Sequence, residues 1–176
     1  MVRLRKNTRL TGFDYSTPGG YFVTICTASL RCLFGEVVDG QMKLNGWGAL
    51  VQESWEEIPF HYPEVRLDAF QVMPNHLHGT LFLEENADMS RRHSLGVIVG
   101  SIKAAASRRI RAHIAKPAFP IWQTSYYEHI IRNDDSLLRI REYILNNPLK
   151  WELDRYNRHA TDRRKGDNWL DFLGGS

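Results

Sequence analysis

Helical and strand-like hydrophobic patterns alternate along this chain in an order that few folds accommodate. Runs rich in β-branched and aromatic residues are typical of strands, and apolar residues three and four apart are typical of helices. The patterns predict strands at residues 21–28, 65–73, 76–83 and 121–131, and helices at residues 45–58, 94–115 and 136–146. Apart from the last helix, this order is the β-α-β-β-α-β split motif. We therefore predict an α+β, ferredoxin-like (RRM-like) antiparallel sheet with helices on one face, an extra C-terminal helix, and a face left for a ligand.

Turn and cap residues support these boundaries. Asp39-Gly40 lies between two short apolar runs and predicts a hairpin inserted after the first strand. Asn45 can cap the first helix, and Pro59 would end it. Pro148 would stop the last helix, because the residue before a proline avoids helical backbone angles.

Composition excludes several classes of protein. The 176 residues, 43% of them hydrophobic and 24% charged, suit one globular domain with a core. We find no run of 18 apolar residues and no signal peptide, so we expect a cytoplasmic protein without a membrane partner. Cys26 and Cys32 are too few for a cysteine zinc site and are expected to be reduced.

Basic residues are concentrated in two stretches, although the net charge is only +3. Residues 91–116 contain seven Lys or Arg and no acidic residue, and a second basic run lies within residues 155–165. Such stripes suit a phosphate backbone, but a solvated helix face and a charged tail give the same pattern.

A His-x-His pair lies on one of the predicted strands. His76 and His78 are two residues apart, so both side chains point to one face while Leu77 points into the core. Neutral imidazoles are common ligands of divalent ions. Taken alone, such a pair is more often a polar sheet face than a metal site.

A tyrosine and an amide share one side of the last predicted helix. Tyr143 and Asn147 are four residues apart, which places them about 40° from each other around the helix axis. The apolar face formed by Leu137, Ile140 and Ile144 lies beside them. A tyrosine at this position is by itself usually an ordinary rim residue.

Together, the two constellations resemble the HUH single-tyrosine nucleases, and within that insertion-sequence-type superfamily they are most similar to the REP-associated tyrosine transposases. The resemblance extends from about residue 11 to residue 154. The matching stretches are GGYFVTICT, LFGEVVDG, LDAFQVMPNHLHG and WQTSYYEHIIRNDDSLLRIREYILNNPLKW.

The resemblance implies a role for each matching residue. His76 and His78 match the metal-binding pair, and Tyr143 matches the nucleophile on a catalytic helix. Asn147 matches the third metal ligand, which is Gln in more distant relatives. The shorter Asn side chain keeps the amide oxygen.

The family's activity and organisation follow as expectations. They are metal-dependent cleavage and strand transfer of single-stranded or hairpin DNA with palindromic repeats, through a 5′-phosphotyrosine. Oxygen and nitrogen ligands suit Mg²⁺ or Mn²⁺. We expect a transposase domain at residues 1–154 and a basic, partly ordered tail at residues 155–176. We favour a monomer, and a homodimer that exchanges the catalytic helix is the alternative.

Basic and aromatic side chains outside the metal centre are candidate DNA contacts, through phosphates or by stacking on unpaired bases. They are Arg3, Arg5, Lys6, Arg108, Arg111, Trp122, Tyr126, Tyr127 and His129. Two other functions remain open on the sequence. One is a non-catalytic nucleic-acid-binding module with a ferredoxin-like sheet. The other is a phosphodiesterase that uses water, for which Tyr143 would be dispensable.

Overall fold

The structure is a computed structural model, and it describes residues 10–85 and 92–158. Four strands form one antiparallel sheet in the order β4-β5-β1-β6. They are β1 (Gly19–Cys26), β4 (Val65–Met73), β5 (His76–Leu83) and β6 (Tyr127–Ile131). A separate hairpin consists of β2 (Gly35–Val38) and β3 (Gln41–Leu44). The helices are α1 (Gly46–Glu56), α2 (Ile58–His61), α3 (Leu95–Ile114) and α4 (Asp134–Asn146).

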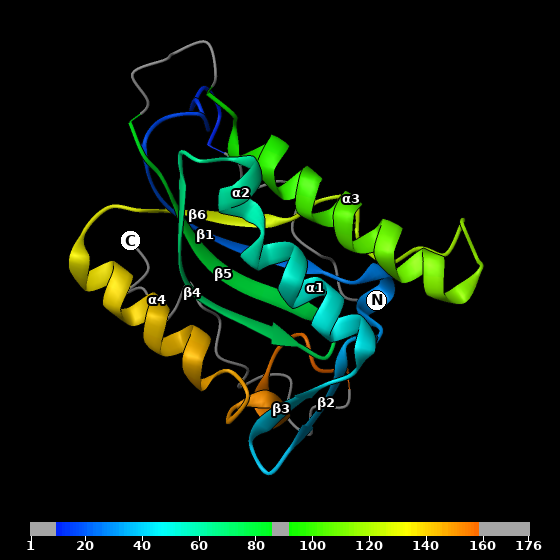
Figure 1. The fold of residues 1–176 in the computed structure, drawn as a ribbon. Helices are drawn as coiled ribbons and strands as arrows, with labels where there is room; N and C mark the ends of the chain where they lie inside the picture. Colours follow the sequence, from blue (N-terminus) through cyan, green and yellow to red (C-terminus); the bar gives the residue numbers. More distant parts are fainter. Residues whose placement is uncertain (1–9, 86–91, 159–176) are drawn as a thin grey trace.

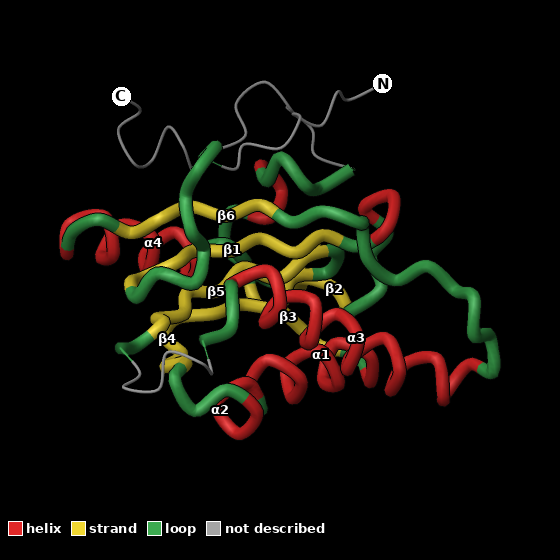
Figure 2. The backbone as a smooth tube through the Cα atoms, turned by 90° about the horizontal axis from the view of Figure 1, so that it is seen from above, coloured by secondary structure: helices red, strands yellow, loops and turns green. Residues whose placement is uncertain are grey.

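The two faces of the sheet are covered by different helices, and the predicted α+β, ferredoxin-like fold is confirmed. Alternate residues of β1 and β5 join α1 and α3 in the main hydrophobic core. Figure 2 shows α1, α2 and α3 gathered along one side of the strands. Helix α4 lies on the other side (Figure 1), where Ile140 and Ile144 pack with Phe22 of β1. The last helix therefore covers the face that the sequence left for a ligand.

Short polar segments fix where the elements begin and turn. Asn45 caps α1 as predicted, and its Oδ1 accepts from the backbone N of Trp47 and of Gly48, both at 3.0 Å. Asp39 and Gly40 have φ angles of 50° and 70°, as the turn of a tight hairpin requires. The predicted boundaries of β4 and β5 also agree with the structure.

Two predicted elements differ from the observed ones. The predicted strand 121–131 is a strand only from Tyr127 onward. Before that residue, Lys103 Nζ donates to the carbonyl oxygens of Gln123 and Thr124, at 2.6 and 3.0 Å, so a side chain takes the place of a strand partner. The first predicted helix is also shorter than expected, because α1 ends at Glu56 and Ile58 and Pro59 belong to the separate short helix α2.

The chain beyond α4 returns to the face of the sheet that α4 covers. A 3-10 turn at Trp151–Leu153 leads to Asp154 and Tyr156, which are 5% and 1% exposed. The second residue of the expected basic tail, Tyr156, is thus buried. The rest of it, residues 159–176, lies outside the described residues. Within the described residues, no helix is long and apolar enough to cross a bilayer.

Candidate metal centre and nucleophile

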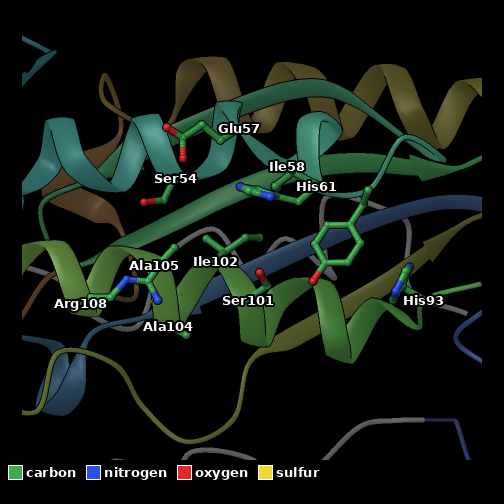
Figure 3. A pocket seen from close by; sticks show the side chains of 11 residues that line it. Ser54, Glu57, Ile58, His61, His93, Ser101, Ile102, Ala104, Ala105 and Arg108 are labelled. Carbon is green, nitrogen blue, oxygen red and sulfur yellow. The ribbon is translucent and has the colours of Figure 1, made fainter.

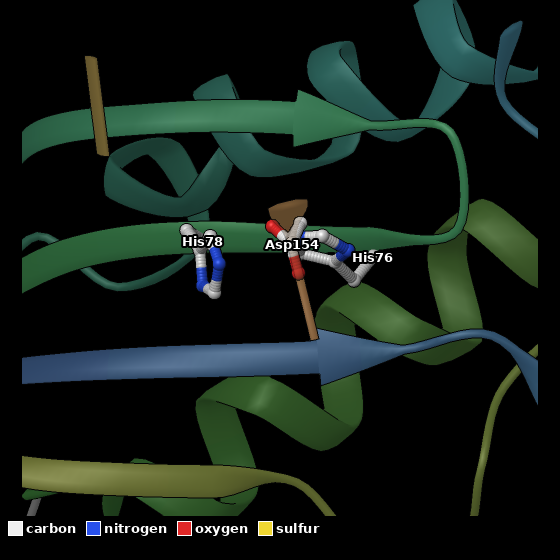
Figure 4. A group of neighbouring side chains, drawn as sticks. All are labelled: His76, His78 and Asp154. Carbon is white, nitrogen blue, oxygen red and sulfur yellow. The ribbon is translucent and has the colours of Figure 1, made fainter. Parts of the chain in front are cut away.

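The two histidines of the His-x-His pair are fully buried on the face of β5 that α4 covers. Their ring centroids are 4.4 Å apart. Figure 4 shows both imidazoles on the same strand, with the carboxylate of Asp154 beside His76. The expected common orientation of His76 and His78 is therefore present.

Hydrogen bonds around His76 determine which ring nitrogen carries the proton. Asn75 Nδ2 donates to the carbonyl oxygens of Leu30 and Tyr156, at 3.1 and 2.8 Å, which fixes the orientation of the amide. Asn75 Oδ1 can then only accept, and it lies 2.8 Å from His76 Nδ1. The proton is consequently on Nδ1. His76 Nε2 keeps a lone pair that is buried and has no hydrogen-bond partner among the described residues.

The second histidine connects the sheet to the candidate nucleophile. His78 Nδ1 lies 2.8 Å from Thr24 Oγ1, and its Nε2 lies 3.4 Å from Tyr143 Oη. Burial lowers the pKa of both imidazoles, and most strongly that of His78. The neighbouring His76 lowers the pKa of His78 further. Asp154 and Asn147 partly oppose this effect at His76. Both rings are therefore neutral near pH 7, as metal ligands must be.

Tyr143 is held in place by the packing of α4 on the sheet. Its side chain is 5% exposed, and its ring meets Phe22 edge to face with centroids 6.2 Å apart. Two residues before Tyr143, Arg141 forms a bidentate pair with Asp68 of β4, with N–O distances of 2.8 and 3.0 Å. Helix α4 is thus attached both by apolar contacts and by a directional ion pair.

The amide predicted as the third ligand has one buried atom without a partner. Asn147 Oδ1 accepts no hydrogen bond from the described residues, whereas its Nδ2 donates to Asp154 Oδ2 at 2.9 Å. Asp154 Oδ2 is also 4.0 Å from His76 Nε2. The ligand atoms of His76, His78 and Asp154 all lie within 4.8 Å of one another.

These residues fit a divalent cation. Two lone-pair atoms, His76 Nε2 and Asn147 Oδ1, are buried and have no hydrogen-bond partner among the described residues, and such atoms are costly unless a ligand satisfies them. Imidazole nitrogens with amide and carboxylate oxygens are a common donor set for Mg²⁺, Mn²⁺ or Zn²⁺. Sequence reasoning missed Asp154, because no helix or strand period relates it to the other three residues.

The aromatic candidates for DNA contact are divided between the two faces. Tyr127 and His129 pair with Thr24 and Phe22 of β1, so they share the face of the metal centre. Tyr126 packs against the main core instead. Tyr126 comes just before β6, and Tyr127 is the one of the two that lies on the face of the histidine pair.

The remaining candidates lie elsewhere. Trp122 packs against Phe34 in the main core, and its indole nitrogen donates to the carbonyl of Lys103 at 3.2 Å. Arg111 donates twice to the carbonyl oxygen of Phe119. Arg108 lines a cavity of about 410 Å³ between α1, α2 and α3 (Figure 3). Both arginines are on α3, across the sheet from Tyr143.

The three N-terminal candidates, Arg3, Arg5 and Lys6, lie outside the described residues.

A ferredoxin-like sheet with a buried histidine pair beside a helix tyrosine is the arrangement expected of a single-tyrosine transposase. The family model described as "Transposase IS200 like" matches residues 49–147, more than half of the chain. The chain belongs to the IS200-like transposase family, and the predicted resemblance is confirmed.

Individual relatives agree with this membership. Over 170 residues the chain is 40% identical to an uncharacterized protein of Haemophilus influenzae, covering 88% of this chain and 93% of that protein. It is 28% identical over 147 residues to a second H. influenzae protein, provisionally named a REP-associated tyrosine transposase. That match covers 78% of this chain and 74% of that protein. A solved REP-associated tyrosine transposase, bound to a REP hairpin, shares the fold with a TM-score of 0.58 at 21% identity. That match covers 84% of this chain and 74% of that chain.

Proposed function

We propose that this chain is a metal-dependent endonuclease and strand transferase for single-stranded DNA. In this proposal Tyr143 is the nucleophile, and the ion is held by His76, His78 and Asn147. The observation that carries it is the 3.4 Å approach of Tyr143 Oη to His78 Nε2 across 65 positions of sequence. This approach brings the phenol into the same buried cluster as His76 Nε2 and Asn147 Oδ1, neither of which has a hydrogen-bond partner in the described part of the chain.

The residues suit attack on a phosphodiester. A divalent ion in this centre would polarise the phosphoryl oxygen and offset the negative charge that develops there. Tyr143 Oη forms a bond to phosphorus as the bond to the 3′-oxygen breaks, which leaves a 5′-phosphotyrosine and a free 3′-hydroxyl. Because the covalent link conserves the energy of the broken bond, the 3′-hydroxyl of another strand can reverse the step and be joined.

Surrounding side chains hold the reacting groups in position. Thr24 and Asn75 bind the Nδ1 atoms of His78 and His76, which leaves the Nε2 atom of each ring for the ion. Such partners fix the ring orientation and increase the basicity of a ligand histidine. Phe22 supports the ring of Tyr143 from the sheet.

We propose that the substrate is a hairpin or palindromic repeat with a single-stranded flank. The solved transposase with the same fold is bound to a REP hairpin, which supports this choice. Tyr127 and His129, on the same sheet face as the histidine pair, are suited to contact the strand next to the scissile phosphate. Arg108 and Arg111, across the sheet, would contact only a more distant part of the DNA.

The experiment that tests the nucleophile compares Tyr143→Phe with Tyr127→Phe. Each variant is incubated with end-labelled hairpin DNA and Mn²⁺, and the products are separated on a denaturing protein gel. We expect a covalent adduct with the wild-type chain and with Tyr127→Phe, and none with Tyr143→Phe. DNA affinity, measured by fluorescence anisotropy, should stay near wild type in Tyr143→Phe. An undiminished adduct in that variant would refute the assignment.

A further inference from the structure

We propose that Asp154 is an anionic ligand of the ion bound by His76 and His78. Its carboxylate follows α4 by one 3-10 turn, and its side chain is 2% exposed. The inference rests on the proposed function, because it concerns the same metal centre. It adds a charged oxygen donor to a centre that otherwise contains only neutral groups.

His76 Nε2 and Asp154 Oδ2 face each other without a proton between them. His76 Nε2 carries a lone pair, because the proton is committed to Nδ1 by Asn75. Asp154 Oδ2 lies 4.0 Å from that lone pair. A cation between them turns a repulsive contact into an attractive one. Two ligand atoms, each about 2.1 Å from one ion, can lie up to about 4.2 Å apart, so the observed spacing allows both to bind.

Two hydrogen bonds orient the carboxylate of Asp154. Asp154 Oδ1 accepts from the backbone N of Tyr156 at 2.7 Å, and Oδ2 accepts from Asn147 Nδ2 at 2.9 Å. The second bond commits the NH₂ group of Asn147 to Asp154. The amide oxygen, which is buried and has no partner among the described residues, is then left for the ion. Asp154 thereby determines which end of the Asn147 amide can bind metal.

The charge of a divalent ion also favours a carboxylate among its ligands. A divalent cation loses most of its hydration when it is buried, and neutral imidazoles and an amide return only part of that free energy. A carboxylate supplies a negative charge and a hard oxygen donor, which Mg²⁺ and Mn²⁺ prefer. Two imidazoles and one carboxylate also leave coordination positions for a phosphate oxygen and for Asn147.

The test is a calorimetric titration of the full chain with Mn²⁺, without DNA. The variant is Asp154→Asn, and the matched control is Glu152→Gln, which removes an exposed carboxylate two residues earlier. We expect the Mn²⁺ dissociation constant to increase by at least about 10- to 100-fold in Asp154→Asn, the loss typical even of groups that only support a ligand. It should be unchanged in Glu152→Gln.

The outcomes separate this inference from the proposed function. If Asp154→Asn is folded and binds Mn²⁺ as tightly as wild type, Asp154 is not a ligand. The proposed function would still hold in that case if the covalent DNA adduct depended on Tyr143. If the double variant His76→Ala/His78→Ala also binds Mn²⁺ like wild type, the metal centre itself is wrong.

Should Asp154→Asn fail to fold, a crystal structure of the Mn²⁺-loaded wild-type chain decides the question. A carboxylate oxygen of Asp154 at a ligand distance of roughly 2.0–2.6 Å from the ion supports the inference. A carboxylate oxygen well beyond that range overturns it.

Discussion

Gly79 lies in the strand that carries both histidines, and the indole ring of Trp55 packs directly against it. It follows His78 in β5 and faces the main core, on the opposite side of the sheet from the proposed metal centre. A Cβ added at Gly79 would lie 2.3 Å from both Cη2 and Cζ2 of Trp55. Trp55 is fully buried in α1 and stacks on Phe70 of β4, so its ring cannot turn into solvent. Gly79→Ala must therefore displace the ring, or α1 with it.

The expected cost follows from two opposing effects. Overpacking a well-filled core costs about 1–3 kcal/mol, and two ring atoms so far inside normal contact distance favour the upper part of that range. Replacing a strand glycine by alanine returns about 0.5–1 kcal/mol of backbone entropy. We expect Gly79→Ala to lower the free energy of unfolding by about 1–2 kcal/mol. In a chain of this length that corresponds to a melting temperature lower by roughly 2–8 °C.

The assay is urea unfolding followed by tryptophan fluorescence and circular dichroism. The matched control is Gly100→Ala, because Gly100 lies on the exposed side of α3 and an added Cβ there meets nothing within 4 Å. Gly100→Ala should stabilise the chain by about 0.5–1 kcal/mol. If Gly79→Ala stabilised the chain by a similar amount, the close contact between Trp55 and the strand would be refuted.

Three further predictions concern a helix cap, the thiols and the metal. Asn45→Ala should lower the free energy of unfolding by about 1 kcal/mol in the same urea assay, because it removes both capping bonds of α1; no change would mean that the cap contributes nothing. Burial raises the pKa of Cys26 to about 12, so at pH 8 its thiolate is suppressed. Iodoacetamide should then label only the exposed Cys32 of the folded chain in mass spectra, and both thiols after unfolding; early double labelling would contradict this. Mn²⁺ at about a hundredfold excess over its dissociation constant should raise the free energy of unfolding by about 2.7 kcal/mol, and EDTA should reverse this increase. An unchanged melting curve would argue against a metal site in the folded chain.

The sequence predicted correctly those elements whose ends are determined by residues next to them in the chain. β4 and β5 agree with the structure because a Pro74-Asn75 turn separates two runs of strand-forming residues. The strand before α4 was predicted too long. A high content of aromatic residues indicates that a segment packs against the core, but not that it pairs with another strand. Trp122 in that segment is half-buried against the core, and among the described residues its only strand pairing is an isolated bridge to Thr27.

The proposed site shows the same distinction between local and long-range information. The common face of His76 and His78, and that of Tyr143 and Asn147, follow from the periods of a strand and a helix. Which face of the sheet the last helix covers depends on a chain reversal that has no periodic signature. Asp154 comes after that reversal, so only the three-dimensional structure could bring it to the histidines.

The two faces of the sheet differ in the interactions that attach the helices to them. This difference determines whether a substitution affects stability or binding. One face is closed by a continuous apolar core with α1 and α3. The other is closed by a small apolar cluster around Phe22 and by hydrogen bonds among buried polar groups. Buried polar groups contribute little net stability when they are paired, and they are costly only when one partner is lost. Conservative changes on the second face should therefore alter metal binding and DNA cleavage much more than folding, whereas changes beneath α1 and α3 should do the reverse.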